Sequence, residues 1–233
     1  MPKNFEQYDS RHFPTVDVQR GYSEWSNFYD EALCEAFDVG LLAELETVKW
    51  PDVRRAADLG CGTGKIGAWM RKRGVAELHG VDCTEAMLRR AATKEAYEAL
   101  VLADLTQTPF PRNSYQLCIS VLAVCHVADL ASFYAEAQRL LAPGGLLVLL
   151  DYHPFFLAKG VPTHYRRPDG EDVAIKNVVH FLSDQVETGL KAGLQLIELK
   201  ERFIDEAWVA ALPNYGKHLH HPVSFAMVWK SSQ

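Results

Sequence analysis

A glycine-rich stretch at residues 58–67, DLGCGTGKIG, constrains the fold of this chain more than any other feature. It follows residues 55–59, a predicted strand, and it leads into residues 65–73, a predicted helix that ends at Gly74. Glycines between a strand and a helix let the backbone approach a ligand and leave helix N–H groups free to bind it. The stretch therefore predicts a strand–loop–helix unit with a ligand at the end of the strand.

The same alternation continues along the chain. Further strands and helices are predicted at residues 77–81, 98–102, 115–121 and 146–150 (strands) and at residues 84–94 and 129–141 (helices). Strands that alternate with helices form parallel sheets, and the fully apolar strand LLVLL suits a sheet that is covered on both faces. The chain is therefore expected to adopt an α/β fold.

The two ends of the chain and one central segment depart from this alternation. Residues 24–46 carry apolar side chains at near-helical spacing and predict one or two amphipathic helices. Residues 152–173 are rich in proline and glycine and predict a long loop. The chain is expected to close with a helix and two strands, at residues 183–192 (capped by Ser183 and stopped by Gly193), 195–203 and 223–229.

Composition and charge exclude several classes of protein. The 233 residues are 48% hydrophobic and 23% charged, as in a soluble globular domain, and the net charge of −6 disfavours a nucleic acid partner. No apolar run approaches the roughly 18 residues that a membrane-spanning helix needs, and the first residues show no secretory signal. The five cysteines form no C-x-x-C pair, which is typical of reduced thiols, so we expect a cytoplasmic protein with no membrane partner.

Two ligands that such a loop often binds fit the neighbouring residues poorly. A phosphate-binding P-loop needs Ser or Thr after its lysine, whereas Ile66 follows Lys65. Residues 62–67 match the G-x-G-x-x-G pattern of dinucleotide sites, but that pattern leaves Asp58 and Gly60 without a role. The glycine pattern alone is therefore weak support for a nicotinamide cofactor.

S-adenosylmethionine gives a role to three acids that follow successive predicted strands. This molecule has a cationic amino acid end, a ribose and an adenine, but no phosphate. Asp58 lies near the glycine turn for the ammonium group, Asp82 can accept both ribose hydroxyls, and Asp104 can accept the adenine amino group beside the N–H of Leu105. Because strand ends meet at one crevice of such a sheet, we predict S-adenosylmethionine as cofactor and S-adenosylhomocysteine as product.

Four stretches of the sequence carry a resemblance to a known family. They are ADLGCGTG (57–64), GVDCTEAML (80–88), LVLADLTQTPFPRNSYQLCISVLAVCHVADL (100–130) and RLLAPGGLLVLLDYHP (139–154). The chain resembles the class I S-adenosylmethionine-dependent methyltransferases, and most of all their small-molecule branch, which includes ubiquinone- and menaquinone-biosynthesis enzymes. The resemblance implies a Rossmann-like, mostly parallel sheet of seven strands in the order 3-2-1-4-5-7-6, with strand 7 antiparallel and helices on both faces.

The resemblance also implies how one domain, residues 1–233, is organised. It would comprise an N-terminal helical lid (1–50), a cofactor-binding core (51–151), an acceptor-side insertion (152–182) and a C-terminal helix with two strands (183–233). Within the core, the cofactor would be held by Asp58, Gly60, Cys61, Gly62, Asp82, Cys83, Met87, Asp104, Leu105, Leu122 and His126.

Aromatic and basic residues outside the core provide further candidates. Tyr22, Trp25 and Tyr29 either pack a helix on the sheet or form a lid over the cofactor, and we favour Tyr22 and Tyr29 as cofactor contacts because aromatic faces suit a sulfonium. On the acceptor side the candidates are His153 and His164 as catalytic bases and Tyr152, Arg166 and Arg167 as substrate contacts. Ordinary solvated loop residues are the alternative, and the histidines in HLHH (218–221) lack the supporting ligands of a metal site.

The sequence thus predicts an enzyme that transfers a methyl group from S-adenosylmethionine to an O, N or C atom of a small, possibly anionic acceptor. A non-catalytic S-adenosylmethionine-binding or regulatory protein is the alternative, followed by a nicotinamide-dependent oxidoreductase. The segment after the fourth strand, SVLAVCHV, lacks the Asn/Asp-Pro-Pro-aromatic stretch of nucleic-acid base methyltransferases. The sequence does not indicate the acceptor or the oligomeric state.

Overall fold

A computed structural model describes residues 3–32 and 38–232 of the chain. Cys34 and the middle of the helical region predicted at 24–46 lie outside these described residues. The parts of that region that are described form short helices. The helices and 3-10 turns before the glycine loop are η1 (Phe5–Gln7), α1 (Val18–Trp25), α2 (Tyr29–Ala32), α3 (Val39–Ala43) and η3 (Trp50–Asp52).

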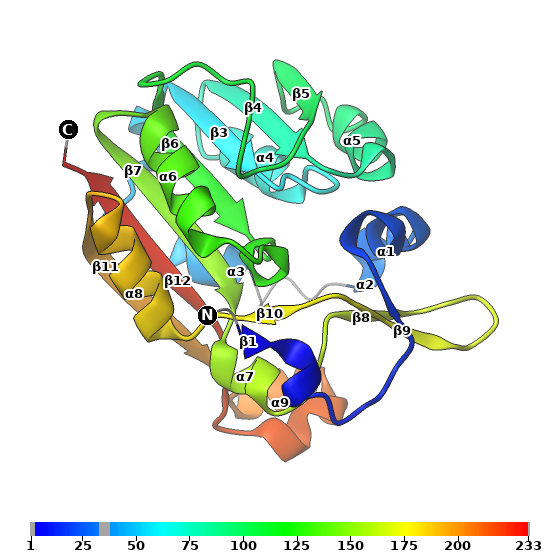
Figure 1. Cartoon of the computed structure of the whole chain (residues 1–233). Coiled ribbons are helices and arrows are strands. Elements are labelled where there is room, and N and C mark those ends of the chain that lie inside the picture. The colour runs from blue at the N-terminus through cyan, green and yellow to red at the C-terminus, as the bar shows by residue number, and fades with distance from the viewer. Residues whose placement is uncertain (1–2, 33–37, 233) are drawn as a thin grey trace.

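Seven strands form the central sheet, and their order confirms the predicted topology (Figure 1). Along the chain they are β3 (Arg55–Leu59), β4 (Glu77–Asp82), β5 (Ala99–Leu102), β6 (Tyr115–Val121), β7 (Leu141–Tyr152), β11 (Leu194–Phe203) and β12 (Pro222–Ser231). Across the sheet they run β5-β4-β3-β6-β7-β12-β11, which is 3-2-1-4-5-7-6 when these seven strands are numbered in sequence. The last strand, β12, is antiparallel to both of its neighbours, as the resemblance implies.

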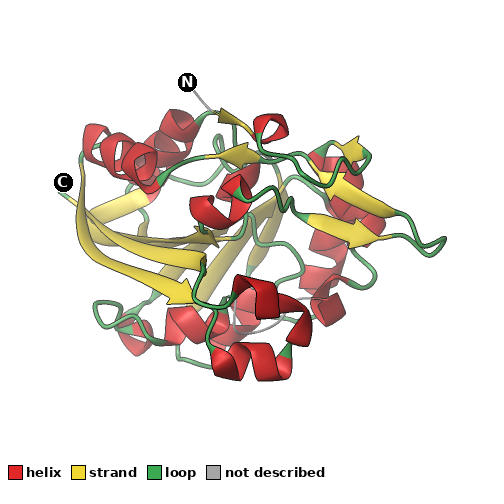
Figure 2. Ribbon diagram, turned by 90° about the horizontal axis from the view of Figure 1, so that it is seen from below, coloured by secondary structure: helices red, strands yellow, loops and turns green. Residues whose placement is uncertain are grey.

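Helices cover both faces of this sheet (Figure 2). They include α4 (Lys65–Arg71), α5 (Glu85–Ala92), η4 (Val124–His126), α6 (Leu130–Leu140) and α8 (Leu182–Lys191). Helices α6 and α8 pack on one apolar cluster and α3 and α4 on another. Strand β7 contributes Leu147 and Leu149 to the first cluster and Val148 and Leu150 to the second. This alternation explains why its sequence is continuously apolar.

Two local predictions about the chain after β7 are wrong. Helix α8 begins at Leu182, and the carboxylate of Asp184 accepts the backbone N–H of Phe181 (2.8 Å), so Ser183 is not the cap. Residues 152–173 are not a continuous loop, because they contain α7 (Pro154–Ala158) and the start of a hairpin. A turn closed by Gly170 N–H and Arg167 O allows that hairpin to form.

The N-terminal segment and the segment after β7 pair with each other. The strands involved are β1 (Lys3–Asn4), β2 (Thr15–Val16), β8 (His164–Arg166), β9 (Asp172–Ile175) and β10 (Val178–Val179). Strand β9 pairs in parallel with β2 and antiparallel with β8, while β1 pairs with β10. These small sheets lie beside the carboxyl ends of the central strands, and α1 and α2 lie next to them (Figure 1).

The chain after β11 adds α9 (Glu206–Ala211) and η5 (Pro213–His218) before it returns as β12. Their residues Trp208 and Tyr215 pack with Phe156 of α7. None of the helices in the described part of the chain is long and apolar enough to cross a membrane.

Candidate functional site

A pocket of about 620 Å³ lies at the carboxyl ends of β3, β4 and β6, and we call it the glycine-loop pocket. All residues that the sequence predicted to contact the cofactor line it, except Asp58 and Cys61. Those that line it are Tyr22, Tyr29, Gly60, Gly62, Asp82, Cys83, Met87, Asp104, Leu105, Leu122 and His126. The fold therefore brings residues from the N-terminal segment and from four parts of the core to one place.

The glycine loop is fixed by its hydrogen bonds to β4. The N–H groups of Gly60 and Cys61 both donate to Val81 O (2.8 and 2.9 Å). Gly60 and Gly62 have positive φ (81° and 52°), a conformation that glycine adopts at little cost. A Cβ on Gly62 would meet no atom within 4 Å, so the backbone at Gly62 is open to a ligand.

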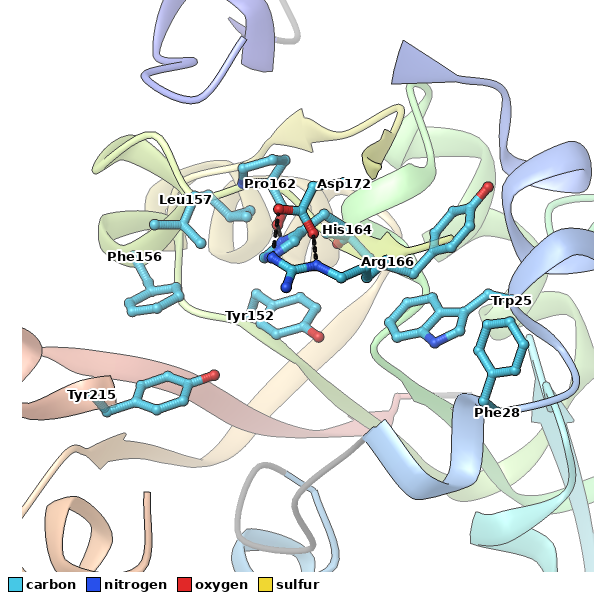
Figure 3. Close-up of a pocket in the computed structure, with 13 residues that line it drawn as sticks. Trp25, Phe28, Tyr152, Phe156, Leu157, Pro162, His164, Arg166, Asp172 and Tyr215 are labelled. Carbon is cyan, nitrogen blue, oxygen red and sulfur yellow. Dashed lines mark hydrogen bonds and ion pairs between the residues drawn. The ribbon is translucent and has the colours of Figure 1, made fainter. Parts of the chain in front are cut away.

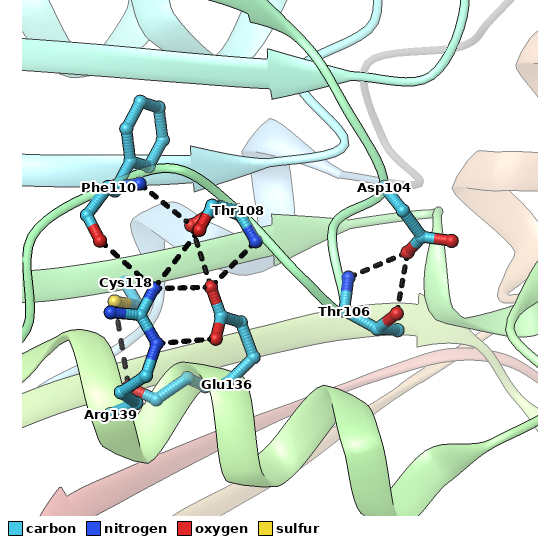
Figure 4. Close-up of polar contacts among 8 residues, drawn as sticks. Asp104, Thr106, Thr108, Phe110, Cys118, Glu136 and Arg139 are labelled. Carbon is cyan, nitrogen blue, oxygen red and sulfur yellow. Dashed lines mark hydrogen bonds and ion pairs between the residues drawn. The ribbon is translucent and has the colours of Figure 1, made fainter.

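Asp82 and Asp104 present carboxylates to this pocket. Asp82 accepts N–H groups from Gly62 (Oδ2, 2.9 Å) and Thr84 (Oδ1, 2.8 Å), while burial raises the pKa of its carboxyl. In Asp104, Oδ1 accepts both the N–H and the hydroxyl of Thr106 at 2.7 Å (Figure 4), and Oδ2 has no partner among the described residues. The lining charges are mostly negative, namely Asp17, Asp82, Asp104 and Asp129 against Lys176.

Asp58 and Cys61 lie behind the loop rather than in the pocket. Asp58 is 1% exposed, accepts the hydroxyl of Tyr97 (2.7 Å), and has its pKa raised by burial to about 7. The thiol of Cys61 is also buried. The ring of Tyr97 packs directly over Gly67, so that a Cβ there would lie 2.3 Å from its hydroxyl. Tyr97 is thus a partner of the loop that the sequence did not reveal.

His126 links the pocket to the N-terminal segment. Its Nδ1 lies 2.7 Å from Lys176 O, and because a carbonyl only accepts, Nδ1 carries the proton. Burial lowers the pKa of the ring to about 4, so Nε2 is an acceptor near neutral pH and receives the hydroxyl of Tyr22 (2.8 Å). Nearby, Asp30 accepts hydrogen bonds from Lys94 (2.7 Å) and from the hydroxyl of Thr63 in the glycine loop.

Figure 3 shows a second cavity of about 620 Å³, which we call the aromatic cavity. It is lined by Trp25, Phe28, Tyr152, Phe156, Leu157, Val161, Pro162, Thr163, His164, Tyr165, Arg166, Asp172 and Tyr215. Trp25 stacks on Tyr22 (ring centroids 6.0 Å apart) and meets Tyr29 edge-on (4.9 Å). Because Tyr22 and Tyr29 line the glycine-loop pocket, these three rings form a wall between the two cavities.

Tyr152, His164 and Arg166, which the sequence predicted on the acceptor side, line the aromatic cavity. The Nδ1 of His164 lies 2.9 Å from Pro162 O. Arg166 forms a bidentate ion pair with Asp172 (2.8 and 2.9 Å).

Two predicted acceptor-side residues lie in neither cavity. Arg167 binds Glu24 (2.7 Å) and Glu171 (2.6 Å). His153 is 7% exposed, with Nε2 at 2.8 Å from a carboxylate oxygen of Glu201 and Nδ1 accepting the N–H of Phe155 (3.1 Å). The described residues contain no group of three or more His, Cys, Asp or Glu side chains that is arranged to hold a metal.

Comparison with known proteins identifies a shared domain. Residues 57–149 match the family described as a methyltransferase domain. A malonyl-[acyl-carrier protein] O-methyltransferase from Halorhodospira halophila is 32% identical over 185 residues, which are 76% of this chain and 60% of that protein. The chain spans about half the length of the curated relatives it matches (60% and 51% of the first two).

Solved structures share the fold at lower identity. An S-adenosylmethionine-dependent methyltransferase from Mesorhizobium loti superposes with a TM-score of 0.66 at 22% identity, covering 86% of this chain and 99% of that one. The complex of DhpI with SAH does so with a TM-score of 0.64 at 16% identity, covering 91% and 94%. The strand order, the glycine loop and the matched domain agree, so the chain contains a methyltransferase domain at residues 57–149 and has the fold of the S-adenosylmethionine-dependent methyltransferases.

Proposed function

We propose that this protein binds S-adenosylmethionine in the glycine-loop pocket and transfers its methyl group to a small molecule in the aromatic cavity. The observation that carries the proposal is that Tyr22 and Tyr29, which line one cavity, pack against Trp25, which lines the other. One cavity is acidic and contains the glycine loop, and the other is mainly aromatic. Two ligands held on either side of this wall would lie next to each other.

The residues of the glycine-loop pocket fit this cofactor. Each carboxylate oxygen of Asp82 accepts one N–H group and keeps a further lone pair, which supports binding of both ribose hydroxyls. Asp104 has a carboxylate oxygen available for the adenine amino group, and Met87 offers an apolar contact. The excess of aspartates suits a sulfonium cation and disfavours the diphosphate of a nicotinamide cofactor.

The chain's own contribution to the reaction is mainly geometric. S-adenosylmethionine supplies an electrophilic methyl group, and its displacement needs the acceptor atom in line with the methyl carbon and sulfur. Holding both ligands in that geometry accounts for a large share of the rate enhancement. For an acceptor that arrives protonated, His164 is the better-supported base, since its Nδ1–H donates to Pro162 O and Nε2 keeps its lone pair. Both ring nitrogens of His153 already have partners.

The acceptor class needs a direct assay. The purified protein is incubated with methyl-labelled S-adenosylmethionine and a metabolite extract, and labelled products are identified by mass spectrometry. A malonyl thioester belongs in the panel because the relative from Halorhodospira halophila is named for a malonyl-carrier substrate. Cofactor binding without any labelled product would favour the non-catalytic alternative.

The cofactor itself is tested by calorimetric titration with S-adenosylmethionine and NAD in parallel. Binding of the first and not the second is the expected result, and the reverse would overturn the proposal. We further propose that the protein acts in the cytoplasm without a nucleic acid partner. The unpaired thiols of Cys61, Cys83, Cys118 and Cys125 and the net charge of −6 support this.

A further inference from the structure

Basic side chains gather at one end of the aromatic cavity, and we call Arg11, Lys159, Lys217, His218 and His221 the His218 cluster. The ring of His218 lies 5.1 Å from Phe156 and 6.4 Å from Tyr215, and both of these rings line the cavity. The ring of His221 lies 5.9 Å from that of His218. The cluster therefore lies next to the cavity, in contact with two of its lining rings through His218.

Contacts between distant segments bring Arg11 and Lys159 to this place. The hydroxyl of Ser10 donates to Gly160 O (3.1 Å), which joins the two segments, and the charges of both Arg11 and Lys159 act on the ring of His218. Lys159 lies with its Nζ 5.2 Å from the ring centre of Phe155, and that ring meets His221 at 5.4 Å. Three segments of the chain thus contribute positive charge to one site.

The cations of this cluster form no ion pair within the described part of the chain, although the charge of Arg11 also acts on the carboxylate of Asp172. Arg11, Lys159 and Lys217 form no ion pair with any described acid, and the buried Nδ1 of His221 has no hydrogen-bond partner there. Burial lowers the pKa of His218, and the positive charges of Lys217, His221, Arg11 and Lys159 lower it further. In a protein with a net charge of −6, this is a local excess of positive charge.

The arginines that the sequence favoured for an anionic acceptor are in a different situation. Arg166 is already bound to Asp172, and Arg167 to Glu24 and Glu171. An anion would have to displace a carboxylate from either guanidinium. The cations of the His218 cluster are exposed at Arg11, Lys159 and Lys217, and none of the three forms an ion pair with a described carboxylate.

We propose that the His218 cluster binds a phosphate-type dianion carried by the acceptor, while the acceptor's apolar part occupies the aromatic cavity. This inference rests on the proposed function, because it assigns the aromatic cavity to the acceptor. Several cations around one site suit a phosphate monoester, which carries nearly two negative charges near pH 7 and offers three acceptor oxygens. An acceptor built in this way has its reactive part beside the wall and its phosphate at the mouth of the cavity.

Phenyl phosphate, inorganic phosphate and phenol test the two halves of this site by calorimetry. If both halves bind one molecule, phenyl phosphate binds at least about tenfold more tightly than either inorganic phosphate or phenol. Lys159→Gln and Arg11→Gln each weaken phenyl phosphate by about threefold to tenfold and leave phenol unchanged. Both replaced side chains are exposed, so the fold is preserved, and Lys72→Gln, at the exposed lysine that caps the end of α4, is the matched control.

Three results would overturn the inference. Equal affinity for phenyl phosphate and inorganic phosphate means an adventitious ion only, with no link to the aromatic cavity. Equal binding of phenyl phosphate by wild type and by the double variant of Arg11 and Lys159 removes the cluster from the site. Loss of affinity in the Lys72 control as well would show that only the overall charge matters. Each titration is repeated with S-adenosylmethionine alone, so that a failure of this inference is distinguished from a failure of the proposed function.

Discussion

Protonation of His126 should destabilise the fold. The folded protein holds the ring neutral, between the hydroxyl of Tyr22 and the carbonyl of Lys176, and burial lowers its pKa from 6.5 to about 4. The unfolded chain takes up a proton near pH 6.5, whereas the folded chain does so only near pH 4. The stabilising contribution is therefore fully present above the unfolded pKa and is lost as the pH falls toward 4.

The size of this loss follows from the two pKa values. If the whole pKa difference is expressed, the free energy of unfolding is lower by about 2.5 kcal/mol at about pH 4.5 than above the unfolded pKa. Since the ring lines a pocket that solvent enters, we expect a loss of about 1–2 kcal/mol. Asp58 and Asp151 act in the opposite direction, because burial raises the pKa of their carboxyls to about 7 and about 6. The pH profile of the wild type alone is therefore not diagnostic.

A His126→Gln variant isolates the contribution, because its amide can donate to Lys176 O and accept from Tyr22 without titrating. Urea unfolding is measured for both proteins at about pH 7.5 and about pH 4.5. As the pH falls from the higher to the lower value, the free energy of unfolding of the variant should decrease by about 1–2 kcal/mol less than that of the wild type. His12→Gln replaces an exposed histidine and is the control. A difference between variant and wild type that does not change with pH would refute the reasoning.

Three further changes test other parts of the structure. Asp82→Ala should weaken S-adenosylmethionine at least about tenfold by calorimetry, since two charge-assisted hydrogen bonds are lost, and unchanged affinity would remove Asp82 from the site. Gly67→Ala should destabilise the fold by about 1–3 kcal/mol in urea unfolding, because the clash with the Tyr97 ring outweighs the better helix propensity of alanine. A variant that is more stable than the wild type would contradict this prediction. Arg139→Met leaves the buried carboxylate of Glu136 without its ion pair (Figure 4) and should lower the free energy of unfolding by about 1–3 kcal/mol in the same assay. An unchanged urea midpoint would show that the hydrogen bonds from Thr108 alone stabilise this carboxylate.

The central sheet could be predicted from the sequence because its signals are local. Strands β3 and β6 have the predicted bounds, whereas β7 begins at Leu141 rather than at Leu146, with a register shift against β6 between these two positions. The segment after β7 could not be predicted in the same way. Its strands β8 and β9 are short, and β9 is completed by residues 15–16, about 160 positions earlier in the chain. The sequence pattern of the segment after β7 does not indicate a partner strand so far away in the chain.

The same distinction separates the residues of the site. Glycines and acids at strand ends face the pocket because the topology brings all such ends together, as with Gly62, Asp82 and Asp104. The surroundings of Asp58 depend on Tyr97, and those of His153 depend on Glu201, which lies 48 positions further along the chain. These long-range contacts decide whether a titratable side chain reaches a cavity, and only the folded structure reveals them.

The pairing of β2 with β9 also has a consequence during synthesis of the chain. Residue 15 cannot find its partner, residue 174, until the ribosome has added about 160 more residues. At about 5–20 residues per second this takes on the order of ten seconds. Throughout that time Trp25 and its neighbouring rings lack the strands that bury them, so the nascent N-terminal segment offers an aromatic surface to chaperones. The wall between the two cavities therefore gains its neighbouring strands only after residues 164–175 have been synthesised.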